Sequence, residues 1–202
     1  RRQGFEVRLY EQAPELAEFG AGINISPNAV KFFRAVGLAD KLHAVGSEPV
    51  GLCWRDWDTG EIRYSLPFGD FEKRYGAKYY VVHRSDLHRL LAEAVPPASV
   101  ALGKRCAAVE SRNGSAGLTF ADGTSAEADV VVGCDGIRSA VRASVFGGEG
   151  PRYVGTMCWR ALAPADALAA DHHDGHVNQW SGEGGLVISY FIRQGKFVWS
   201  ID

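Results

Sequence analysis

Apolar and polar residues alternate in some stretches of this chain and recur at helical spacing in others. Alternation predicts a strand over 5–10. Apolar residues at helical spacing predict a helix that Ser26 caps and Gly37 ends. Residues 79–82 form another apolar run, and a helical stripe follows it until two prolines end that helix. Strands that alternate with helices in this way indicate an α/β fold.

The middle and the end of the chain carry a pattern that is typical of antiparallel strands. Two strand-like runs within 50–66 flank an Asp-Thr-Gly turn at 58–60, which predicts a β-hairpin. Residues 100–132 predict a meander of short strands, and the segment after 151 again has the pattern of antiparallel strands. We expect the hairpin and the last segment to contribute to a second sheet.

The stretch VVVGCDGIRSAVR, residues 130–142, joins an apolar run to a helix through a turn that contains glycines. Three consecutive valines are typical of a central strand covered on both faces, so we predict a buried strand over 130–132. Ser139 marks the start of the helix that follows. Because open α/β sheets bind ligands at the carboxyl ends of such strands, Asp135 and Gly136 are candidate ligand contacts. A simple turn is the alternative.

Three further positions have the chemistry of a nucleotide site. Glu11 follows the first strand, where a dinucleotide fold places the acid that accepts hydrogen bonds from a ribose; a surface glutamate is the alternative. The Gly-Ala-Gly loop at 20–22 has no large side chain, so a ligand can approach its backbone, or it is only a flexible loop. Arg84 lies in the turn before a helix that we expect Ser85 to cap, where it can hold a phosphate or merely cover the surface.

Charge and cysteine content exclude several classes of protein. A net charge of −2 is too small for a nucleic-acid groove or an anionic membrane surface, and no apolar run reaches the roughly 20 residues that span a bilayer. The four cysteines form no CxxC pair, which argues against zinc and favours a reducing cytoplasm. The histidines and aspartates at 171–176 lie in a polar stretch, which predicts a solvated loop and no metal site. A serine hydrolase is not supported, because no GxSxG motif occurs.

Together, the motifs are similar to those of the FAD-dependent aromatic hydroxylases, which are single-component flavin monooxygenases. The motifs are EQAP at 11–14, GAGINISPNAV at 20–30, HRSDLHRLL at 83–91, GCDGIRSAVR at 133–142 and CWRALAP at 158–164. The resemblance runs over essentially the whole chain. It is greatest to the branch of salicylate hydroxylase, 3-hydroxybenzoate 6-hydroxylase and 6-hydroxynicotinate 3-monooxygenase.

The resemblance implies an α/β fold with two parts. A Rossmann-like FAD-binding domain, incomplete here, is expected from 1–49 and 77–150, and a mostly antiparallel β-sheet substrate domain from 50–76 and 151–202. The glycine-rich GxGxxG turn and the GDA-type segment of the family do not occur in this sequence. We therefore expect the chain to be part of a longer protein.

The resemblance also implies eight contacts to FAD, at Glu11, Gly22, Ile23, Asn24, Arg84, Cys106, Asp135 and Gly136. Glu11 resembles the acid that holds the adenosine ribose, and Arg84 resembles the arginine at the phosphate–ribityl region. The GAGIN segment resembles the one that passes the ribityl chain and the flavin, with Asn24 near the ring. Cys106 matches a position whose backbone faces the adenine. The pair at 135–136 resembles the DG motif, which touches FAD and is implicated in the use of NAD(P)H.

On the substrate side, several relatives carry a histidine four residues before a tyrosine. Here the tyrosine matches Tyr190, our candidate catalytic residue, whereas the histidine position is Leu186. Arg193 is a further candidate for the substrate region. The usual base is therefore missing if Leu186 aligns.

The implied reaction is the hydroxylation of a small aromatic or heteroaromatic acid by dioxygen, with FAD as cofactor and NADH or NADPH as co-substrate. We expect a cytoplasmic monomer or homodimer without a nucleic-acid or membrane partner. Two alternatives stay open. The chain is a non-catalytic fragment with weak nucleotide binding, or the flavoprotein catalyses another reaction, such as an epoxidation or a dehydrogenation.

Overall fold

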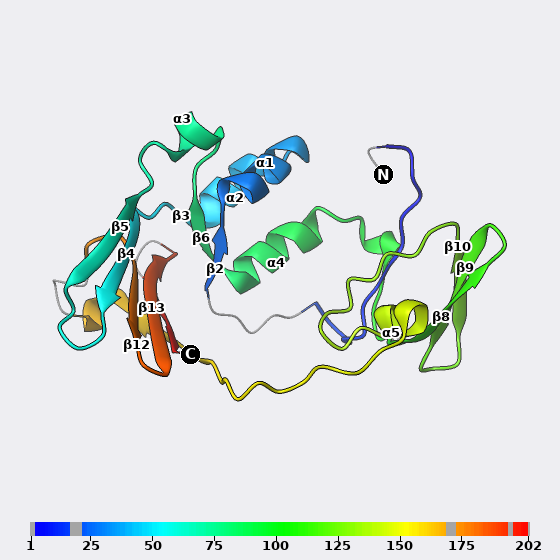
Figure 1. The fold of residues 1–202 in the computed structure, drawn as a ribbon. Helices are drawn as coiled ribbons and strands as arrows, with labels where there is room; N and C mark the ends of the chain where they lie inside the picture. Colours follow the sequence, from blue (N-terminus) through cyan, green and yellow to red (C-terminus); the bar gives the residue numbers. More distant parts are fainter. Residues whose placement is uncertain (1–2, 17–21, 169–172, 194–195, 202) are drawn as a thin grey trace. The chain divides into compact units, whose positions relative to one another are not determined.

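The structure is a computed structural model that describes residues 3–16, 22–168, 173–193 and 196–201 (Figure 1). Its contacts group the chain into two compact units. Unit 1 comprises Arg1–Leu16 and Glu93–Gly155, and unit 2 comprises Ala17–Ala92 and Thr156–Asp202. The expected division into an FAD-binding domain and a substrate domain concerns a complete protein and stays a prediction.

Unit 1 combines a parallel pair of short strands with an antiparallel meander. Its elements are β1 (Leu9–Tyr10), the 3-10 helix η1 (Pro97–Ser99), β7 (Val100–Ala101), β8 (Cys106–Arg112), β9 (Ser115–Phe120), β10 (Ser125–Ala128) and α5 (Ala140–Phe146). β1 pairs in parallel with β7, and the order β10-β9-β8 is the predicted meander. The ring of Tyr10 packs on the buried ring of Phe120, with 4.7 Å between the centroids, and so joins β1 to the meander.

Two strand predictions in unit 1 are wrong. The valines at 130–132 are not in a strand, and Val130 and Val132 are 75% and 77% exposed. The strand expected over 5–10 is limited to Leu9–Tyr10, and Phe5 is 71% exposed. The physical reason is the same in both cases: an extended run becomes a strand only beside a hydrogen-bonded neighbour, and no described strand pairs with these residues.

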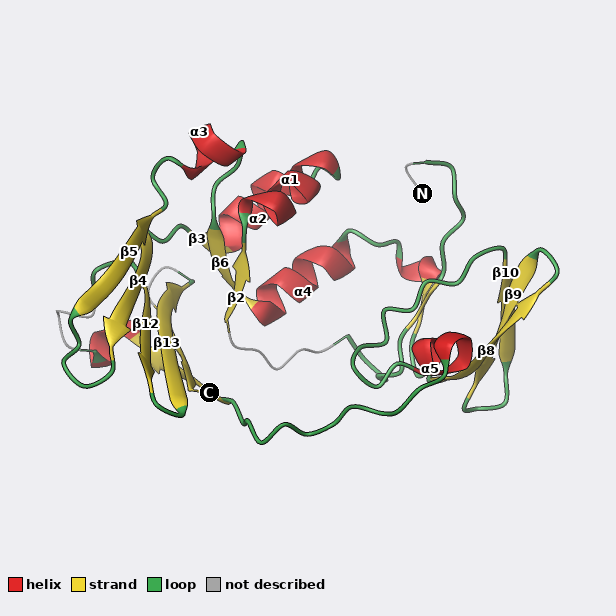
Figure 2. Cartoon of the chain, in the orientation of Figure 1, coloured by secondary structure: helices red, strands yellow, loops and turns green. Residues whose placement is uncertain are grey.

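Unit 2 contains the remaining elements, which Figure 2 shows by type. Its helices are α1 (Pro27–Ala35), α2 (Ala39–Val45), α3 (Phe71–Tyr75), α4 (Arg84–Glu93) and the 3-10 helix η2 (Ala165–Ala167). Its strands are β2 (Gly22–Ile25), β3 (Gly46–Ser47), β4 (Gly51–Asp56), β5 (Ile62–Pro67), β6 (Tyr80–His83), β11 (Trp159–Pro164), β12 (Val177–Gly182), β13 (Gly185–Ile192) and β14 (Lys196–Ile201).

The strands of unit 2 form two sheets. One has the order β2-β6-β3, and the other has the order β11-β14-β13-β12-β4-β5. β4 and β5 form the predicted hairpin. In the larger sheet only β12 and β4 pair in parallel, with Val177 opposite Leu52. The fold class is therefore α/β with a mostly antiparallel sheet, as predicted.

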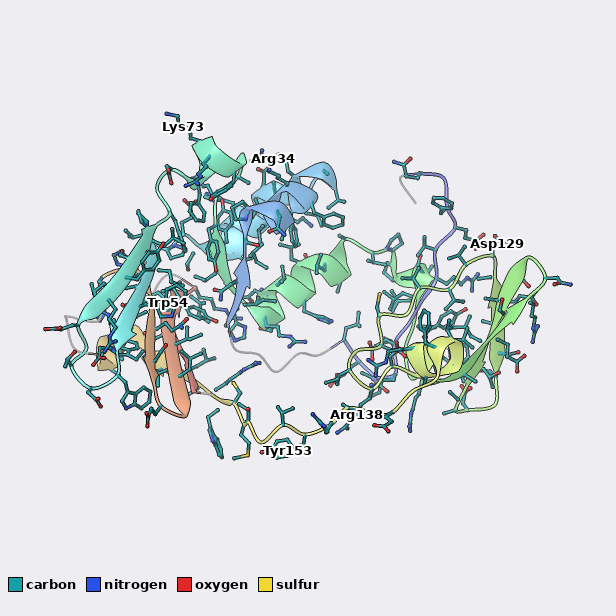
Figure 3. All side chains as sticks on the ribbon, viewed as in Figure 1. Arg34, Trp54, Lys73, Asp129, Arg138 and Tyr153 are labelled. Carbon is teal, nitrogen blue, oxygen red and sulfur yellow. The ribbon has the colours of Figure 1, made fainter. Side chains whose placement is uncertain are left out.

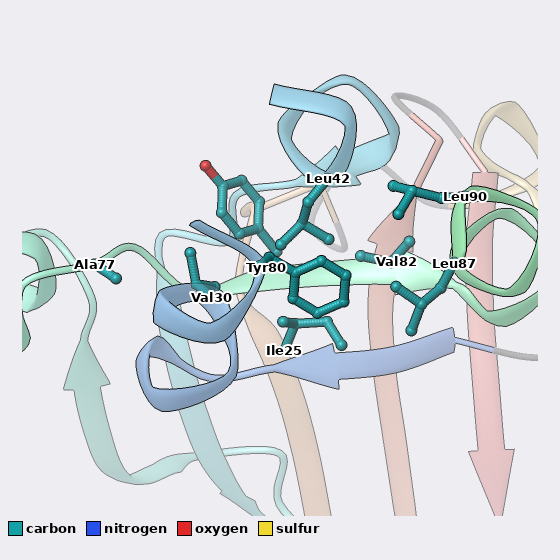
Figure 4. Close-up of a cluster of buried hydrophobic side chains, with 9 residues drawn as sticks. Ile25, Val30, Leu42, Ala77, Tyr80, Val82, Leu87 and Leu90 are labelled. Carbon is teal, nitrogen blue, oxygen red and sulfur yellow. The ribbon is translucent and has the colours of Figure 1, made fainter. Parts of the chain in front are cut away.

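The core of unit 2 lies around β6, whose four residues are all buried. The apolar side chains of β2, β6, α1, α2 and α4 pack together here (Figure 4). The buried members are Ile25, Val30, Phe33, Leu42, Ala77, Tyr80, Val82, Leu87 and Leu90. Residues of β2 and α4, two elements that carry several candidate site residues, therefore pack into the same core.

The helix predicted after Ser26 has the expected limits. Proline occupies the first helical position, and the chain leaves the helix through Gly37 at a φ of +71°, a left-handed conformation that glycine adopts without steric cost. Ser26 stands at the N-cap position, but its hydroxyl donates to Asn28 Oδ1 and makes no cap bond.

The start of α4 differs from the expectation that Ser85 is its cap. The helix begins at Arg84, so Arg84 is its first residue and does not lie in the turn before it. His83 takes the capping role, because its Nδ1 lies 3.3 Å from the amide nitrogen of Ser85, which donates to it, and 2.5 Å from Ser85 Oγ. Serine is the commoner cap, which is why the sequence favoured the wrong residue.

Candidate functional site

Glu11 is fixed at the end of β1 with part of its carboxylate available. Its amide donates to Ala101 O at 3.0 Å, and its carbonyl accepts from the Lys104 amide at 2.8 Å. One carboxylate oxygen, Oε1, accepts from the Ala13 amide at 2.8 Å, whereas Oε2 has no hydrogen-bond partner among the described residues. Both backbone groups of Glu11 are hydrogen-bonded, which fixes its position, and one carboxylate oxygen is free within the described part of the chain. Such an acid can accept hydrogen bonds from ribose hydroxyls.

Cys106 and Asp135 interact within unit 1. Burial raises the pKa of the Cys106 thiol, and the negative charge of Asp135 raises it further. The thiol is therefore protonated at neutral pH, and it donates to Ala108 O at 3.7 Å. The expectation that the backbone of Cys106 faces the adenine stays a prediction.

Asp135 organises the turn before α5. Its Oδ1 accepts from Ser139 Oγ at 2.5 Å, and its Oδ2 accepts from the Val141 amide at 3.1 Å. Partial desolvation raises the pKa of Asp135, but these hydrogen bonds outweigh it, and the pKa lies below its usual value. Ser139 is the predicted N-cap and accepts from the Arg142 amide at 2.9 Å. Asp135 is therefore a charged residue that also supports a helix start.

The glycines on either side of Asp135 serve different purposes. A Cβ at Gly133 would lie 2.8 Å from Val141 Cβ, so glycine is needed for α5 to approach the chain. Gly136 has a φ of +75° and no atom within 4 Å of the place a Cβ would take. Arg138, which the sequence analysis did not single out, is exposed in the same turn (Figure 3). This turn is therefore open to a ligand beside Gly136 and presents both an acid and an arginine.

In unit 2, the segment from Gly22 to Asn24 forms β2 and lies antiparallel to β6. Ile23 packs against the core, whereas Asn24 is exposed, as expected from the alternation of side chains along a strand. Gly22 lies opposite His83, which immediately precedes Arg84. The first two residues of the Gly-Ala-Gly loop, 20 and 21, lie outside the described residues.

Tyr190 of β13 packs directly on Gly22. A Cβ at position 22 would lie 2.2 Å from Tyr190 Cε2 and 2.3 Å from Tyr190 Oη, so only glycine leaves room for this ring. Tyr190 is 6% exposed, and burial raises its pKa to about 12. Its phenol is therefore neutral at physiological pH and can donate a hydrogen bond.

Arg84 is exposed at the start of α4, a ten-residue helix. Backbone amides at a helix N-terminus and a guanidinium both favour an anion, which is the chemistry that a phosphate group requires. The residue adopts this place because the side chains of α4 that follow it, Leu87 and Leu90, are buried on the core face.

The candidate residues fall into two sets. Unit 1 holds Glu11, Cys106, Asp135 and Gly136, and brings Cys106 together with Asp135. Unit 2 holds Gly22, Ile23, Asn24, Arg84 and Tyr190, and brings Gly22 together with Tyr190. Each set holds groups with chemistry that suits part of an FAD molecule. Unit 1 has an acid for ribose and an open glycine, Gly136, and unit 2 has an exposed arginine for phosphate.

The polar stretch at 171–176 is only partly described, because Asp171 and His172 lie outside the described residues. Asp174 accepts from Arg55 Nη2 at 3.1 Å and from the His176 amide at 2.9 Å, and the His173 ring lies 5.2 Å from that of Phe191. Within the described ranges, no three His, Cys, Asp or Glu side chains are placed to share a metal ion. In the same ranges, no helix has the length and apolar character needed to cross a membrane.

The sequence is similar to a family of FAD-binding domains and to several curated monooxygenases. The FAD binding domain family matches residues 1–184. The chain is 41% identical over 194 residues to 6-hydroxynicotinate 3-monooxygenase of Pseudomonas fluorescens, covering 95% of this chain and 50% of that protein. It is 42% identical over 199 residues to 3-amino-4-hydroxybenzoate 2-monooxygenase of Streptomyces cremeus, covering 98% and 50%. The chain thus spans about half the length of these relatives.

Solved structures extend the similarity to the fold. Klebsiella pneumoniae HpxO complexed with FAD and uric acid matches with a TM-score of 0.87 at 27% identity, covering 99% of this chain and 50% of that one. The predicted resemblance to FAD-dependent aromatic hydroxylases is confirmed at the level of the family. From the match over residues 1–184, the chain belongs to the FAD binding domain family.

Proposed function

We propose that the complete protein is an FAD-dependent monooxygenase that hydroxylates a small aromatic or heteroaromatic acid, with NADH or NADPH and dioxygen as co-substrates. The relatives named above support this class, since their names describe monooxygenases of hydroxylated nicotinate and benzoate. Bound FAD would supply the transfer of electrons and the activation of dioxygen, and the protein would bind, orient and shield.

The proposed cofactor contacts follow from the chemistry of each side chain. The free Oε2 of Glu11 would accept from ribose hydroxyls. The exposed guanidinium of Arg84 would hold a phosphate. Asp135 and Gly136, with the backbone of Cys106, would complete the contacts in unit 1. The exposed Asn24 would lie beside the ring.

The observation that carries the proposal is the contact between Tyr190 and Gly22. The family resemblance implies that the GAGIN segment lies beside the flavin and that β13, which carries Tyr190, lies beside the substrate. The close approach of the ring to the glycine therefore joins the two sides within unit 2. A neutral, buried phenol in this place suits a group that donates a hydrogen bond to an aromatic acid and excludes water.

Leu186 bears on which residue could act as the base that deprotonates the substrate. It lies on β13 four residues before Tyr190, so both side chains belong to the same face of the strand. An aliphatic side chain cannot accept a proton, and a phenol with a pKa of about 12 is a poor base near neutral pH. We therefore propose that Tyr190 orients the substrate and that neither residue deprotonates it.

The test uses the complete, purified protein. Its visible absorbance spectrum should contain flavin bands, and consumption of NADH or NADPH should rise when the correct member of a panel of hydroxylated aromatic acids is added. The mass of the product should exceed that of the substrate by one oxygen atom. Oxidation of the nicotinamide without an oxygenated product would instead support another flavoprotein reaction, and the absence of flavin would contradict the proposal altogether.

A further inference from the structure

Asp86 is a buried carboxylate for which the proposed function gives no role. It lies in the first turn of α4 and is 4% exposed. Arg193 reaches it from the chain immediately after β13, where Arg193 Nε donates to Oδ2 and Arg193 Nη2 donates to Oδ1 at 2.6 Å. Arg89 Nη2 adds a third bond, to Oδ1 at 3.0 Å, but its side chain is 66% exposed. The two-nitrogen bond from Arg193 is thus the main partner of this carboxylate.

Arg193 adopts a backbone conformation that favours glycine. Its φ is +49°, and it is the one residue other than glycine with a positive φ in the described ranges. Arg193 Nη2 also donates to Ser85 Oγ at 3.3 Å. A positive φ costs free energy in any residue other than glycine. We infer that the side-chain bonds of Arg193 offset this cost.

The position of Asp86 on α4 links it to Arg84. Residues two apart on a helix lie about 200° apart around its axis, so they face nearly opposite sides. In agreement, Asp86 is buried, whereas Arg84 is exposed. Fixing Asp86 therefore fixes the rotation of the first turn, and with it the direction in which Arg84 extends.

A second contact joins the same elements three residues earlier on β13. Tyr190 packs on Gly22, Gly22 lies opposite His83, and the Nδ1 of His83 caps the amide of Ser85. β13 is therefore attached to the β2–β6 pair by Tyr190 and to α4 by Arg193. Three proposed site residues, Gly22, Arg84 and Tyr190, depend on these two attachments.

We propose that Asp86 and Arg193 are positioning residues, whose ion pair fixes the first turn of α4 against the end of β13 and so sets Arg84 in place relative to Tyr190. The inference rests on the proposed role of Arg84 in binding FAD. The hydrogen bond from Arg193 keeps the pKa of Asp86 below its usual value, so the carboxylate is charged at neutral pH. The same bonds occupy two guanidinium nitrogens of Arg193, which then has a structural partner in place of the substrate expected from the sequence.

The experiment measures the dissociation constant of FAD in the complete protein by titration of flavin fluorescence. Arg193→Lys keeps the charge but loses the two-nitrogen geometry, and Asp86→Asn keeps the shape but loses the charge. Each should raise the dissociation constant about tenfold, because bonds to a charged group are lost. Arg89→Ala is the matched control, since it removes an exposed arginine from the same carboxylate, and it should change the constant by less than about twofold.

A double variant separates positioning from a general loss of stability. If the ion pair acts through Arg84, Arg84→Ala combined with Arg193→Lys should bind FAD no more weakly than Arg84→Ala alone. Fully additive effects would overturn the inference. So would a lower melting temperature of Arg193→Lys with an unchanged dissociation constant, which is the result of a purely structural role.

Two further outcomes distinguish a failure of this inference from a failure of the proposed role of Arg84. If Arg84→Ala leaves the dissociation constant unchanged, the proposed role of Arg84 is wrong and the inference fails with it. If Arg84→Ala weakens binding while the variants of Asp86 and Arg193 do not, only the inference fails. Arg193→Gly provides a variant that suits the positive φ, so a folding defect caused by the turn itself does not obscure the result.

Discussion

Tyr190 and Gly22 show how one small residue determines the place of a large one. The ring of Tyr190 occupies the space that a side chain at position 22 would need. Tyr190 is almost fully buried in this place. Packed interiors adapt poorly to added volume, because neighbouring atoms have few empty spaces into which they can move. The contact between β2 and β13 therefore depends on the absence of a single methyl group.

Replacing Gly22 by alanine tests this dependence. We expect Gly22→Ala to lower the free energy of unfolding by about 1–3 kcal/mol, because the new Cβ collides with the ring of Tyr190. Gly69 is a matched control in the same unit, since it has no positive φ and no atom within 4 Å of the place that a Cβ would take. Gly69→Ala should change the free energy by no more than about 0.5 kcal/mol in urea unfolding. Equal effects of the two substitutions would contradict the packing argument.

The raised pKa of Tyr190 predicts a loss of stability at alkaline pH. Burial raises its pKa to about 12 in the folded protein, whereas a tyrosine in an unfolded chain has a pKa of about 10. A folded pKa above the unfolded one means that the contribution to stability is complete below pH 10 and is lost as the pH rises through about 12. Tyr190→Phe should therefore weaken the alkaline fall of the unfolding free energy. An identical pH profile for the variant would show that Tyr190 ionises as freely as an exposed tyrosine.

Among the elements, α5 depends on two side chains that come before it. Ser139 accepts from the Arg142 amide, and Asp135 accepts from the Val141 amide and from Ser139 itself. Loss of such a cap costs about 1 kcal/mol. Stability alone therefore does not distinguish a structural Asp135 from one that also binds the cofactor.

A comparison of Ser139→Ala with Asp135→Ala makes that distinction. Both variants should lower the free energy of unfolding by about 1 kcal/mol, because each removes a hydrogen bond from the start of α5. Only Asp135→Ala should reduce the flavin content and the rate of flavin reduction of the complete protein, if the resemblance to the DG motif holds. Equal flavin content and rates in the two variants would leave Asp135 with its capping role alone.

Elements that depend on local signals could be predicted from the sequence. The hairpin at 58–60 and the limits of α1 follow from turn and helix-stop residues that lie next to these elements in the sequence. The strand expected over 130–132 could not be judged in this way. Its valines have the right composition, but a strand also needs a neighbour, and the sequence does not show which neighbour is present.

In the candidate site, too, features with a local sequence signal could be predicted, whereas contacts between distant residues could not. The positions of Glu11 after a strand and of Ser139 before a helix were readable from local pattern. The bond between Asp86 and Arg193 was not, because the two lie 107 positions apart and the motif HRSDLHRLL gives no sign of the partner. The capping role of His83 was missed because histidine is not a common cap.

For the whole molecule, the proposed FAD contacts are divided between the two compact units, with Glu11 and Asp135 in unit 1 and with Gly22 and Arg84 in unit 2. A ligand that binds only the folded state protects the segments it orders. We therefore expect FAD to slow amide hydrogen exchange in both units of the complete protein, around these four residues. Protection confined to one unit would show that half of the proposed contacts are wrong.

The parallel pairing of β12 with β4 has a consequence for the synthesis of the protein. The chain between the end of β4 at Asp56 and the start of β12 at Val177 is about 120 residues long. At about 5–20 residues per second, a ribosome needs roughly 6–24 s to produce it. During that time β5 covers one edge of β4, while the hydrogen-bonding groups of the other edge wait for a partner that has not yet been translated. The yield of folded protein should therefore depend on elongation rate and on chaperones that cover the nascent edge.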